Sequence, residues 1–324
     1  MTGEKIVAVD LGGTNARFAI AELHDNRRPT LHPPRKYKTA DYPGLAAAWA
    51  AFARDEDARL PRAASIAIAA PVDDELIRFT NNSWVIRPAS LAQELGIERL
   101  SLFNDFAAMA AAVGVLEPAE LAYIGGPEGP LPGEGVTTVI GPGTGLGVAQ
   151  LLRRDGRNIV LATEGGHIDF AALDAFEERL LGRLRERHRR VSVERVVSGP
   201  ALADIRATLA LIGSQAIVPM DDASLWQAAC DASDPLAAQA LDRLVMTFGA
   251  VAGDLALAQG ANAVVITGGL ANRFATRLSG PLFNDRFRAK GRFERRMAEF
   301  PIRLACYPEA GLLGAAAAFQ EEQR

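Results

Sequence analysis

The residues of this chain best suited to chemistry lie in short glycine turns that follow apolar stretches. In the segment "VAVDLGGTNARFAIAE", Gly12 and Gly13 follow an apolar run and precede Thr14 and Asn15. Backbone N–H groups in such a turn, with a hydroxyl beside them, suit the oxygens of a phosphate group. Many phosphate-binding loops lead into a helix, whereas the residues after Asn15 favour a second strand. We therefore expect a phosphate-binding turn inside a hairpin.

Two further glycine turns resemble the first. Gly143, Thr144 and Gly145 follow the apolar start of "VTTVIGPGTGLGVAQLL", and Gly268 and Gly269 follow another apolar strand. One such turn alone is typical of an ordinary hairpin, in which glycine adopts a positive φ. The threonines after the glycines favour phosphate binding. Because such a hairpin occurs near the start of each half of the chain, we expect two related α/β domains that together bind a nucleotide.

An aspartate ends the first strand beside the first glycine turn. Asp10 lies directly before Leu11 and the two glycines. A lone aspartate at a strand end is usually a turn residue, but a carboxylate repels phosphate unless a cation lies between them. Mg²⁺ bound through water would be such a cation. We therefore predict that Asp10 contacts Mg²⁺ beside the nucleotide phosphates.

Asp105 in "FNDF" lies where a strand is expected to end and a helix to begin, so these residues alone favour a carboxylate that caps the helix. Glu164 and His167 in "EGGH" have the spacing of a helical metal motif. Their two intervening glycines disfavour a helix, and no second copy of the motif occurs. For His167 alone, a buried structural role is an equal alternative.

The expected secondary structure places these residues at strand ends. Asp234 and Pro235 predict the start of a long helix that Gly260 ends. Apolar runs predict strands at 6–10, 17–22, 64–69, 100–103 and 263–267, and helices are expected at 42–54, from about 106, and in the tail "EAGLLGAAAAFQEE".

The composition is that of an ordinary globular chain. Of the 324 residues, 49% are hydrophobic and 23% are charged, which suits two domains with sizeable cores. The net charge of −4 argues against a nucleic-acid partner. The chain has two cysteines and no apolar run of about 18 residues, the length of a membrane-spanning helix. We expect a cytoplasmic protein with no disulfide framework and no membrane partner.

Six motifs, in their order along the chain, resemble those of the bacterial ATP-dependent glucokinase family. They are "VDLGGTNARFA", "NDFAA", "GPGTGLGVA", "EGGHIDFA", "ERVVSGP" and "ITGGLANRF". The resemblance covers nearly the whole chain and is specific as a set. It implies the two-domain actin-like ATPase (ribonuclease H-like) fold, an α/β fold with mixed sheets, helices and a cleft between the domains. The expected small domain is 1–115 plus 309–324, and the expected large domain is 116–308.

The resemblance also implies substrates and residue roles. ATP with Mg²⁺ phosphorylates the 6-hydroxyl of D-glucose, Asp105 is the general base, and a homodimer is expected. The implied sugar contacts are Asn104, Asp105, Glu164, His167 and Glu194, with Asn81 a weaker candidate beside Trp84, a predicted core residue. The implied phosphate contacts are Asp10, Gly12, Gly13, Thr14, Asn15, Gly143, Thr144, Gly145, Gly268 and Gly269.

Alternative functions follow from the same sequence. Carboxylates that bind hydroxyls do not reveal which epimer they select, so a kinase for fructose, mannose or an amino sugar stays open. A sugar-sensing repressor without activity would need a DNA-binding segment, yet the phosphate hairpin begins at Ile6. A polymerising or chaperone ATPase of this fold would not need the sugar-contact residues. The cysteine-rich zinc motif of related sugar kinases is absent, which indicates the zinc-free group.

Overall fold

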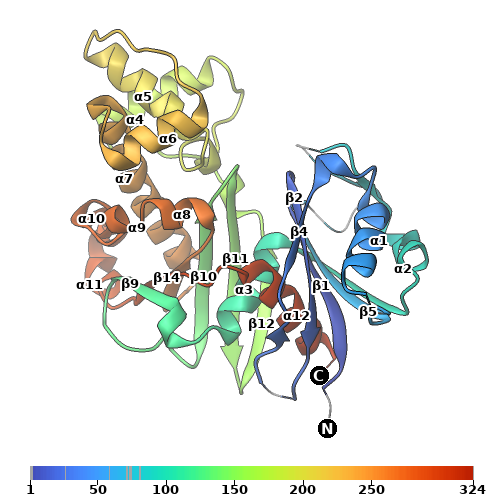
Figure 1. Cartoon of the computed structure of the whole chain (residues 1–324). Coiled ribbons are helices and arrows are strands. Elements are labelled where there is room, and N and C mark those ends of the chain that lie inside the picture. Colours follow the sequence, from blue (N-terminus) through green and yellow to red (C-terminus); the bar gives the residue numbers. More distant parts are fainter. Residues whose placement is uncertain are drawn as a thin grey trace. The chain divides into compact units, whose positions relative to one another are not determined.

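The computed structural model describes residues 3–25, 27–57, 59–70, 72, 75–79 and 82–323. These residues belong to two compact units, and Figure 1 labels most of their helices and strands. Unit 1 comprises Met1–Glu117, Gln150–Ala162 and Tyr307–Arg324, and unit 2 comprises Pro118–Ala149 and Thr163–Cys306.

Unit 1 is built on a mixed sheet covered by helices. Its elements are β1 (Lys5–Leu11), β2 (Asn15–Glu22), β3 (Thr30–Leu31), β4 (Arg35–Lys38), η1 (Thr39–Asp41), α1 (Leu45–Asp55), β5 (Ala63–Ile68), β6 (Ile77–Arg78), β7 (Val85–Ile86), α2 (Pro88–Leu95), β8 (Arg99–Asn104), α3 (Asp105–Val115) and α12 (Ala310–Glu322). The sheet order is β3-β2-β1-β5-β8, with β4 paired to β2. β1 pairs antiparallel with β2, as the glycine-turn hairpin predicts, and parallel with β5, which pairs parallel with β8.

Helices cover both faces of this sheet, and the side chains of β1 point alternately to the two faces. Val9 of β1 shares a buried cluster with Phe52 of α1, while the neighbouring Ala8 shares another with Leu312 of α12. Successive strand side chains point to opposite faces, so one strand serves both clusters. α12 also packs against α3, and Gly314 permits this approach because a Cβ there would clash with the backbone of α3. The start of α3 is therefore held firmly at the end of β8.

A second mixed sheet carries the other glycine turns. The elements that follow α3 are η2 (Pro118–Glu120), β9 (Leu121–Gly125), β10 (Gly135–Pro142), β11 (Leu146–Arg154), β12 (Arg157–Thr163), η3 (Gly165–His167), α4 (Ala175–Arg185), η4 (Val193–Arg195), α5 (Ala201–Ile212), α6 (Asp222–Asp231), α7 (Pro235–Ala258), β13 (Ala263–Ile266), α8 (Gly269–Arg273), α9 (Ala275–Leu278), α10 (Pro281–Arg288), η5 (Gly291–Phe293), α11 (Glu294–Met297) and β14 (Ile302–Ala305). The sheet order is β12-β11-β10-β13-β14-β9, in which β10, β13 and β14 run parallel.

The two sheets share one strand order. The path β2-β1-β5-β8 corresponds to β11-β10-β13-β14, so each sheet contains a pair of consecutive strands followed by two parallel strands. In each case a predicted glycine turn joins the two consecutive strands. The predicted repeat is therefore confirmed at the level of strand order, although the sequences of the two copies differ.

The helix-start and helix-end signals are also confirmed for the long helix. The Asp234 carboxylate accepts hydrogen bonds from the N–H groups of Leu236 and Ala237 at the start of α7. Gly260 follows the end of α7 with φ +65°, which favours glycine. The helix predicted at 42–54 begins at Leu45 instead, because Gly44 is its N-cap residue. Trp84 is 1% exposed, as predicted for a core residue.

Candidate active site

The first glycine turn is held by hydrogen bonds within the turn and by Thr39, the first residue of η1. The N–H of Gly12 donates to the carbonyl of Asn15 at 3.0 Å. Thr39 supports the turn twice, since its hydroxyl donates to the carbonyl of Gly13 at 3.0 Å and its N–H donates to the carbonyl of Thr14 at 3.0 Å. Thr14 itself is exposed. The carbonyl oxygens of Gly13, Thr14 and Asn15 thus accept hydrogen bonds within unit 1, while Thr14 is exposed to solvent.

Glycine at Gly12 and Gly143 has no explanation inside the chain. Neither residue has a positive φ. A Cβ at Gly143 would meet no heavy atom within 4 Å, and a Cβ at Gly12 would make only an ordinary contact at 3.5 Å. A ligand that approaches the backbone closely would explain both glycines, because any side chain would block it. The predicted phosphate contacts would give both glycines such a ligand.

Asp10 already has a cationic partner in the chain. Its Oδ2 accepts a hydrogen bond from the guanidinium of Arg17 at 2.8 Å, and Asp10 lies opposite Arg17 in the register of β1 and β2. Gly311, at the start of α12, lies so close that a Cβ there would contact the Asp10 carboxylate. Arg17 is therefore a cation beside Asp10 in addition to the predicted Mg²⁺. The register of the hairpin would have revealed this partner.

Asp10 is the carboxylate that could contact Mg²⁺ in this site. Among the residues that the structure describes, no three His, Cys, Asp or Glu side chains lie together as a metal cage. Mg²⁺ in phosphoryl-transfer enzymes usually keeps waters and uses one or two carboxylates together with substrate phosphates. One half-buried carboxylate at Asp10 fits that mode of binding, and it does not fit a resident metal centre.

The second glycine turn is tied to two other segments of unit 2. The N–H of Gly143 donates to the carbonyl of Gly145 at 2.8 Å, and the N–H of Gly199 donates to the carbonyl of Gly143 at 2.7 Å. Glu194 Oε2 accepts from the N–H of Leu146 at 3.0 Å. A Cβ at Gly145 would clash with this carboxylate, so Gly145 is glycine for packing. Gly199 was not predicted as a site residue, and the "SGP" motif directly before α5 was the signal for it.

The third glycine pair lies at the end of β13. Gly268 has φ +100°, which only glycine adopts readily. Gly269 begins α8, and a Cβ there would meet nothing within 4 Å. A Cβ at Gly268 would lie 3.5 Å from the carbonyl of Pro142, which directly precedes Gly143. The glycine pairs of β10 and β13 are therefore neighbours, as expected for adjacent parallel strands.

The predicted sugar contacts of unit 2 lie on two adjoining turns. His167 Nε2 lies 3.8 Å from Glu164 Oε2, and both side chains are more than half exposed. The glycines between them pack against β11, where a Cβ at Gly166 would clash with the carbonyl of Leu146. Glu194 binds the N–H of the same Leu146. The structure therefore brings Glu164, His167 and Glu194 to one end of β11.

The remaining predicted sugar contacts belong to unit 1. Asn104 is the N-cap of α3, and its Oδ1 accepts from the N–H groups of Phe106 and Ala107 at 2.9 and 3.3 Å. Asp105 follows as the first helical residue, with its Oδ1 2.9 Å from the N–H of Phe106. The alternative in which Asp105 is the helix cap is therefore wrong. Asn81 lies outside the described residues.

Two sheets of matching strand order with a glycine turn in each hairpin are the arrangement of the actin-like ATPase fold, to which sugar kinases belong. The chain matches the family described as Glucokinase over residues 7–322. It belongs to the glucokinase family, and the predicted fold class is confirmed. Within the described residues, no helix is both long and apolar enough to cross a membrane.

Individual relatives support this assignment along the whole chain. A glucokinase of Zymomonas mobilis subsp. mobilis is 52% identical over 315 residues, which cover 97% of each chain. A glucokinase of Stenotrophomonas maltophilia is 40% identical, covering 99% of this chain and 96% of that protein. The crystal structure of a glucokinase from an Antarctic psychrotroph is 31% identical with a TM-score of 0.85, covering 97% of this chain and 98% of that one.

Proposed function

We propose that this chain transfers the γ-phosphoryl group of ATP to the 6-hydroxyl of D-glucose, giving glucose 6-phosphate and ADP. The observation that carries the proposal is the family match from residue 7 to residue 322, which includes both hairpin turns and every candidate sugar contact. The space beside the backbone of Gly12 and Gly143 supports the proposal. A phosphate bound there would explain why both residues are glycine, which packing within the fold does not.

In this proposal the sugar is held by hydrogen bonds and activated by one base. Asp105 accepts the proton of the 6-hydroxyl while that oxygen bonds to the γ-phosphorus and the bond to the ADP oxygen breaks. Asn104 donates through Nδ2, because its Oδ1 already caps α3. Glu164, His167 and Glu194 contact the other hydroxyls. Ionised carboxylates accept strong hydrogen bonds from hydroxyls and disfavour analogues that lack them.

The glycine turns hold the nucleotide phosphates in this proposal. Asp10 would hold Mg²⁺, and the ion, when bound with ATP, would neutralise charge on the phosphates. Because Arg17 shares the Asp10 carboxylate, the contact to the ion is expected to be secondary to those of ATP. The proposed phosphate contacts are Gly12, Gly13, Thr14, Asn15, Gly143, Thr144, Gly145, Gly268 and Gly269.

A coupled assay of ADP release across several hexoses tests the proposal. We expect D-glucose to give the highest kcat/KM, with fructose, mannose and glucosamine well below it. A higher value for one of these sugars would assign the enzyme to that hexose, and no ADP release with any sugar would overturn the kinase function. Omitting the sugar provides the control for background ATP hydrolysis.

Three expectations from the sequence stay part of the proposal. A homodimer is expected in solution, and sedimentation equilibrium would measure it. A cytoplasmic location is expected, and cell fractionation would measure it. The domain boundaries at 115, 116, 308 and 309 would be tested by limited proteolysis.

A further inference from the structure

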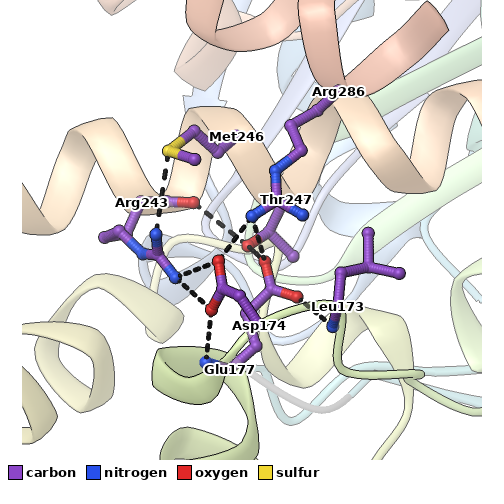
Figure 2. A network of polar contacts seen from close by, with 7 residues as sticks. All are labelled: Leu173, Asp174, Glu177, Arg243, Met246, Thr247 and Arg286. Atoms are coloured by element: carbon purple, nitrogen blue, oxygen red, sulfur yellow. Dashed lines mark hydrogen bonds and ion pairs between the residues drawn. The ribbon is translucent and has the colours of Figure 1, made fainter. Parts of the chain in front are cut away.

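Glu177 is a buried carboxylate in the first turn of α4, and the proposed reaction does not use it. It is 1% exposed. Its Oε2 accepts a hydrogen bond from the N–H of Leu173 at 2.7 Å, and its Oε1 lies 3.2 Å from the hydroxyl of Thr247 (Figure 2). A charge buried this deeply is costly unless it is paired. Arg286, whose Nη2 lies 3.8 Å from Oε1, provides that pairing.

The neighbouring Asp174 locks the start of α4 to two other helices. Asp174 caps α4 by accepting from the N–H of Glu177 at 3.0 Å. The guanidinium of Arg243 on α7 donates to both of its oxygens at 2.6 and 2.7 Å, and Arg286 on α10 donates at 2.5 Å (Figure 2). The start of α4 is therefore fixed to α7 and α10 within unit 2. In the same turn, the Glu177 carboxylate accepts the hydrogen bond from the N–H of Leu173.

The segment that Glu177 holds leads directly to the proposed sugar contacts. Residues 168–170 form a short ladder with 191–193, in which the N–H of Phe170 donates to the carbonyl of Val191 at 3.0 Å and the N–H of Val193 to the carbonyl of Ile168 at 2.9 Å. His167 directly precedes one strand of this ladder, and Glu194 directly follows the other. A shift of the ladder would therefore move both residues.

Apolar packing and one hydrogen bond together join the ladder to α4. Phe170 and Val193 share a buried cluster with Leu181 of α4. A cavity of about 50 Å³ nevertheless lies beside Ile168, Leu173 and Glu177. The hydrogen bond from Leu173 to Glu177 therefore adds a directional contact at a place that side chains do not fill completely.

We propose that Glu177 is a positioning residue for the sugar: through Leu173 it holds the ladder of 168–170 and 191–193, and so sets the places of His167 and Glu194. This inference rests on the proposed function. Glu177 does not touch the substrate. Its effect falls first on glucose binding, and it reaches the nucleotide turn at Gly143–Gly145 only indirectly, through the bond from Leu146 to Glu194.

The test compares Glu177→Met, Glu177→Gln and the control Arg303→Met. Methionine keeps the volume but removes the acceptor, whereas the glutamine oxygen still accepts from Leu173. Arg303 is a matched control, because it is 4% exposed and also holds backbone, donating to the carbonyls of Pro127 and Gly129 at 2.8 Å. Steady-state kinetics would give KM for glucose and for ATP, and melting temperatures would report folding.

We expect Glu177→Met to raise KM for glucose by about 10- to 100-fold, the effect of misplacing contacts by roughly 1 Å, with KM for ATP changed less than about twofold. Glu177→Gln should stay within about threefold of the wild type, because it restores the acceptor. A rise in KM for glucose no larger than that of Arg303→Met would overturn the inference. If Glu177→Met does not fold, Leu173→Pro takes its place, because proline has no N–H to donate to Glu177, and an unchanged KM for glucose would have the same meaning.

Amide hydrogen exchange without sugar separates this inference from the proposed function. Peptides covering 168–174 and 191–194 should exchange faster in Glu177→Met than in the wild type and remain unchanged in Arg303→Met. If the wild type does not phosphorylate glucose, the proposed function fails. If the wild type is active and these peptides exchange alike in Glu177→Met, the positioning role alone fails.

Discussion

Asn104 and Asp105 are adjacent, yet the structure gives them different tasks. The cap of α3 belongs to Asn104, whose Oδ1 accepts from two backbone N–H groups. Asp105 lies one residue further on, in the first turn of the helix. A structural role as N-cap therefore does not account for Asp105, and its proposed role as base can be tested by substitution.

Asp105→Asn should lower kcat by about 10²- to 10⁴-fold, the usual effect of losing a positioned general base. Affinity for glucose and the melting temperature should change little, because asparagine has the same size and Asn104 keeps the cap. Turnover assays, glucose titration by intrinsic fluorescence and thermal melts would measure the three quantities. Near-normal kcat would leave the base unassigned.

Asn104→Ser separates the cap from the sugar contact. Serine caps helices about as well as asparagine, so stability should fall by only a few tenths of a kcal/mol, roughly the spread among good caps. The amide donor is lost, so KM for glucose should rise by about 10-fold, as for one hydrogen bond of about 1.5 kcal/mol. Asn104→Ala is the control that removes both functions and should also lower the melting temperature. Unchanged KM in the serine variant would remove Asn104 from the sugar site.

Asp10→Ala tests the proposed Mg²⁺ contact against the ion pair with Arg17. If Asp10 contacts the ion, the variant should need more Mg²⁺ and its KM for ATP should rise about 10-fold, because a charge-assisted contact contributes about 1.5–3 kcal/mol. Glucose binding should be retained. Arg17→Met is the matched control, since it removes the ion pair but leaves the carboxylate. Equal behaviour of the two variants would show that the ion pair is the whole role of Asp10.

At the scale of elements, the start of α4 depends on the charge of Asp174. Burial alone would raise the pKa of this carboxyl, but hydrogen bonds from the N–H of Glu177 and from Arg243 and Arg286 outweigh it and hold the pKa below its ordinary value of 3.8. A lowered pKa in the folded state means that the carboxylate stabilises the fold at pH values above 3.8. This contribution is lost as the pH falls through the pKa of the folded state.

Asp174→Asn should therefore destabilise the protein by about 1–3 kcal/mol near pH 7, because two half-buried guanidiniums lose their charged partner. The difference from the wild type should shrink as the pH falls below 3.8. Urea unfolding between pH 7 and pH 3 would measure it. Asp222→Asn is the control, because Asp222 is exposed in the first turn of α6. A pH-independent difference for Asp174→Asn would contradict the charge-based explanation.

At the scale of the whole molecule, the proposed sugar contacts are divided between the two units. Asn104 and Asp105 belong to unit 1, whereas Glu164, His167 and Glu194 belong to unit 2. A glucose molecule that uses both sets must engage both units, and such engagement commonly draws domains together.

Small-angle scattering should therefore show a smaller radius of gyration with saturating glucose than without it. L-glucose, which presents its hydroxyls with the opposite hand, is the control and should leave the radius unchanged. Binding of D-glucose would be confirmed separately by calorimetry. An unchanged radius with bound D-glucose would mean that the sugar engages one unit only.

Local patterns in the sequence predicted some of the strands and helices and suggested the residue types of the site. The turn at Gly12 and Gly13 predicted a hairpin, and Asp234 predicted the start of α7, because turn geometry and helix caps depend on a few neighbouring residues. The resemblance of six motifs identified the family for the same reason, since each motif is a short run of adjacent residues. The proposed roles of the individual residues stay predictions.

Contacts between distant residues were decided by the tertiary structure alone. The bond from Leu146 to Glu194 and the clamp of Arg243 and Arg286 on Asp174 join segments far apart in the chain, and no local pattern specifies them. Their formation depends on how helices and strands pack, which is a property of the whole core. Asn104 rather than Asp105 is the cap because β8 continues through Asn104 and α3 begins at Asp105. The sequence by itself thus determined which groups are available, and the packing determined their partners.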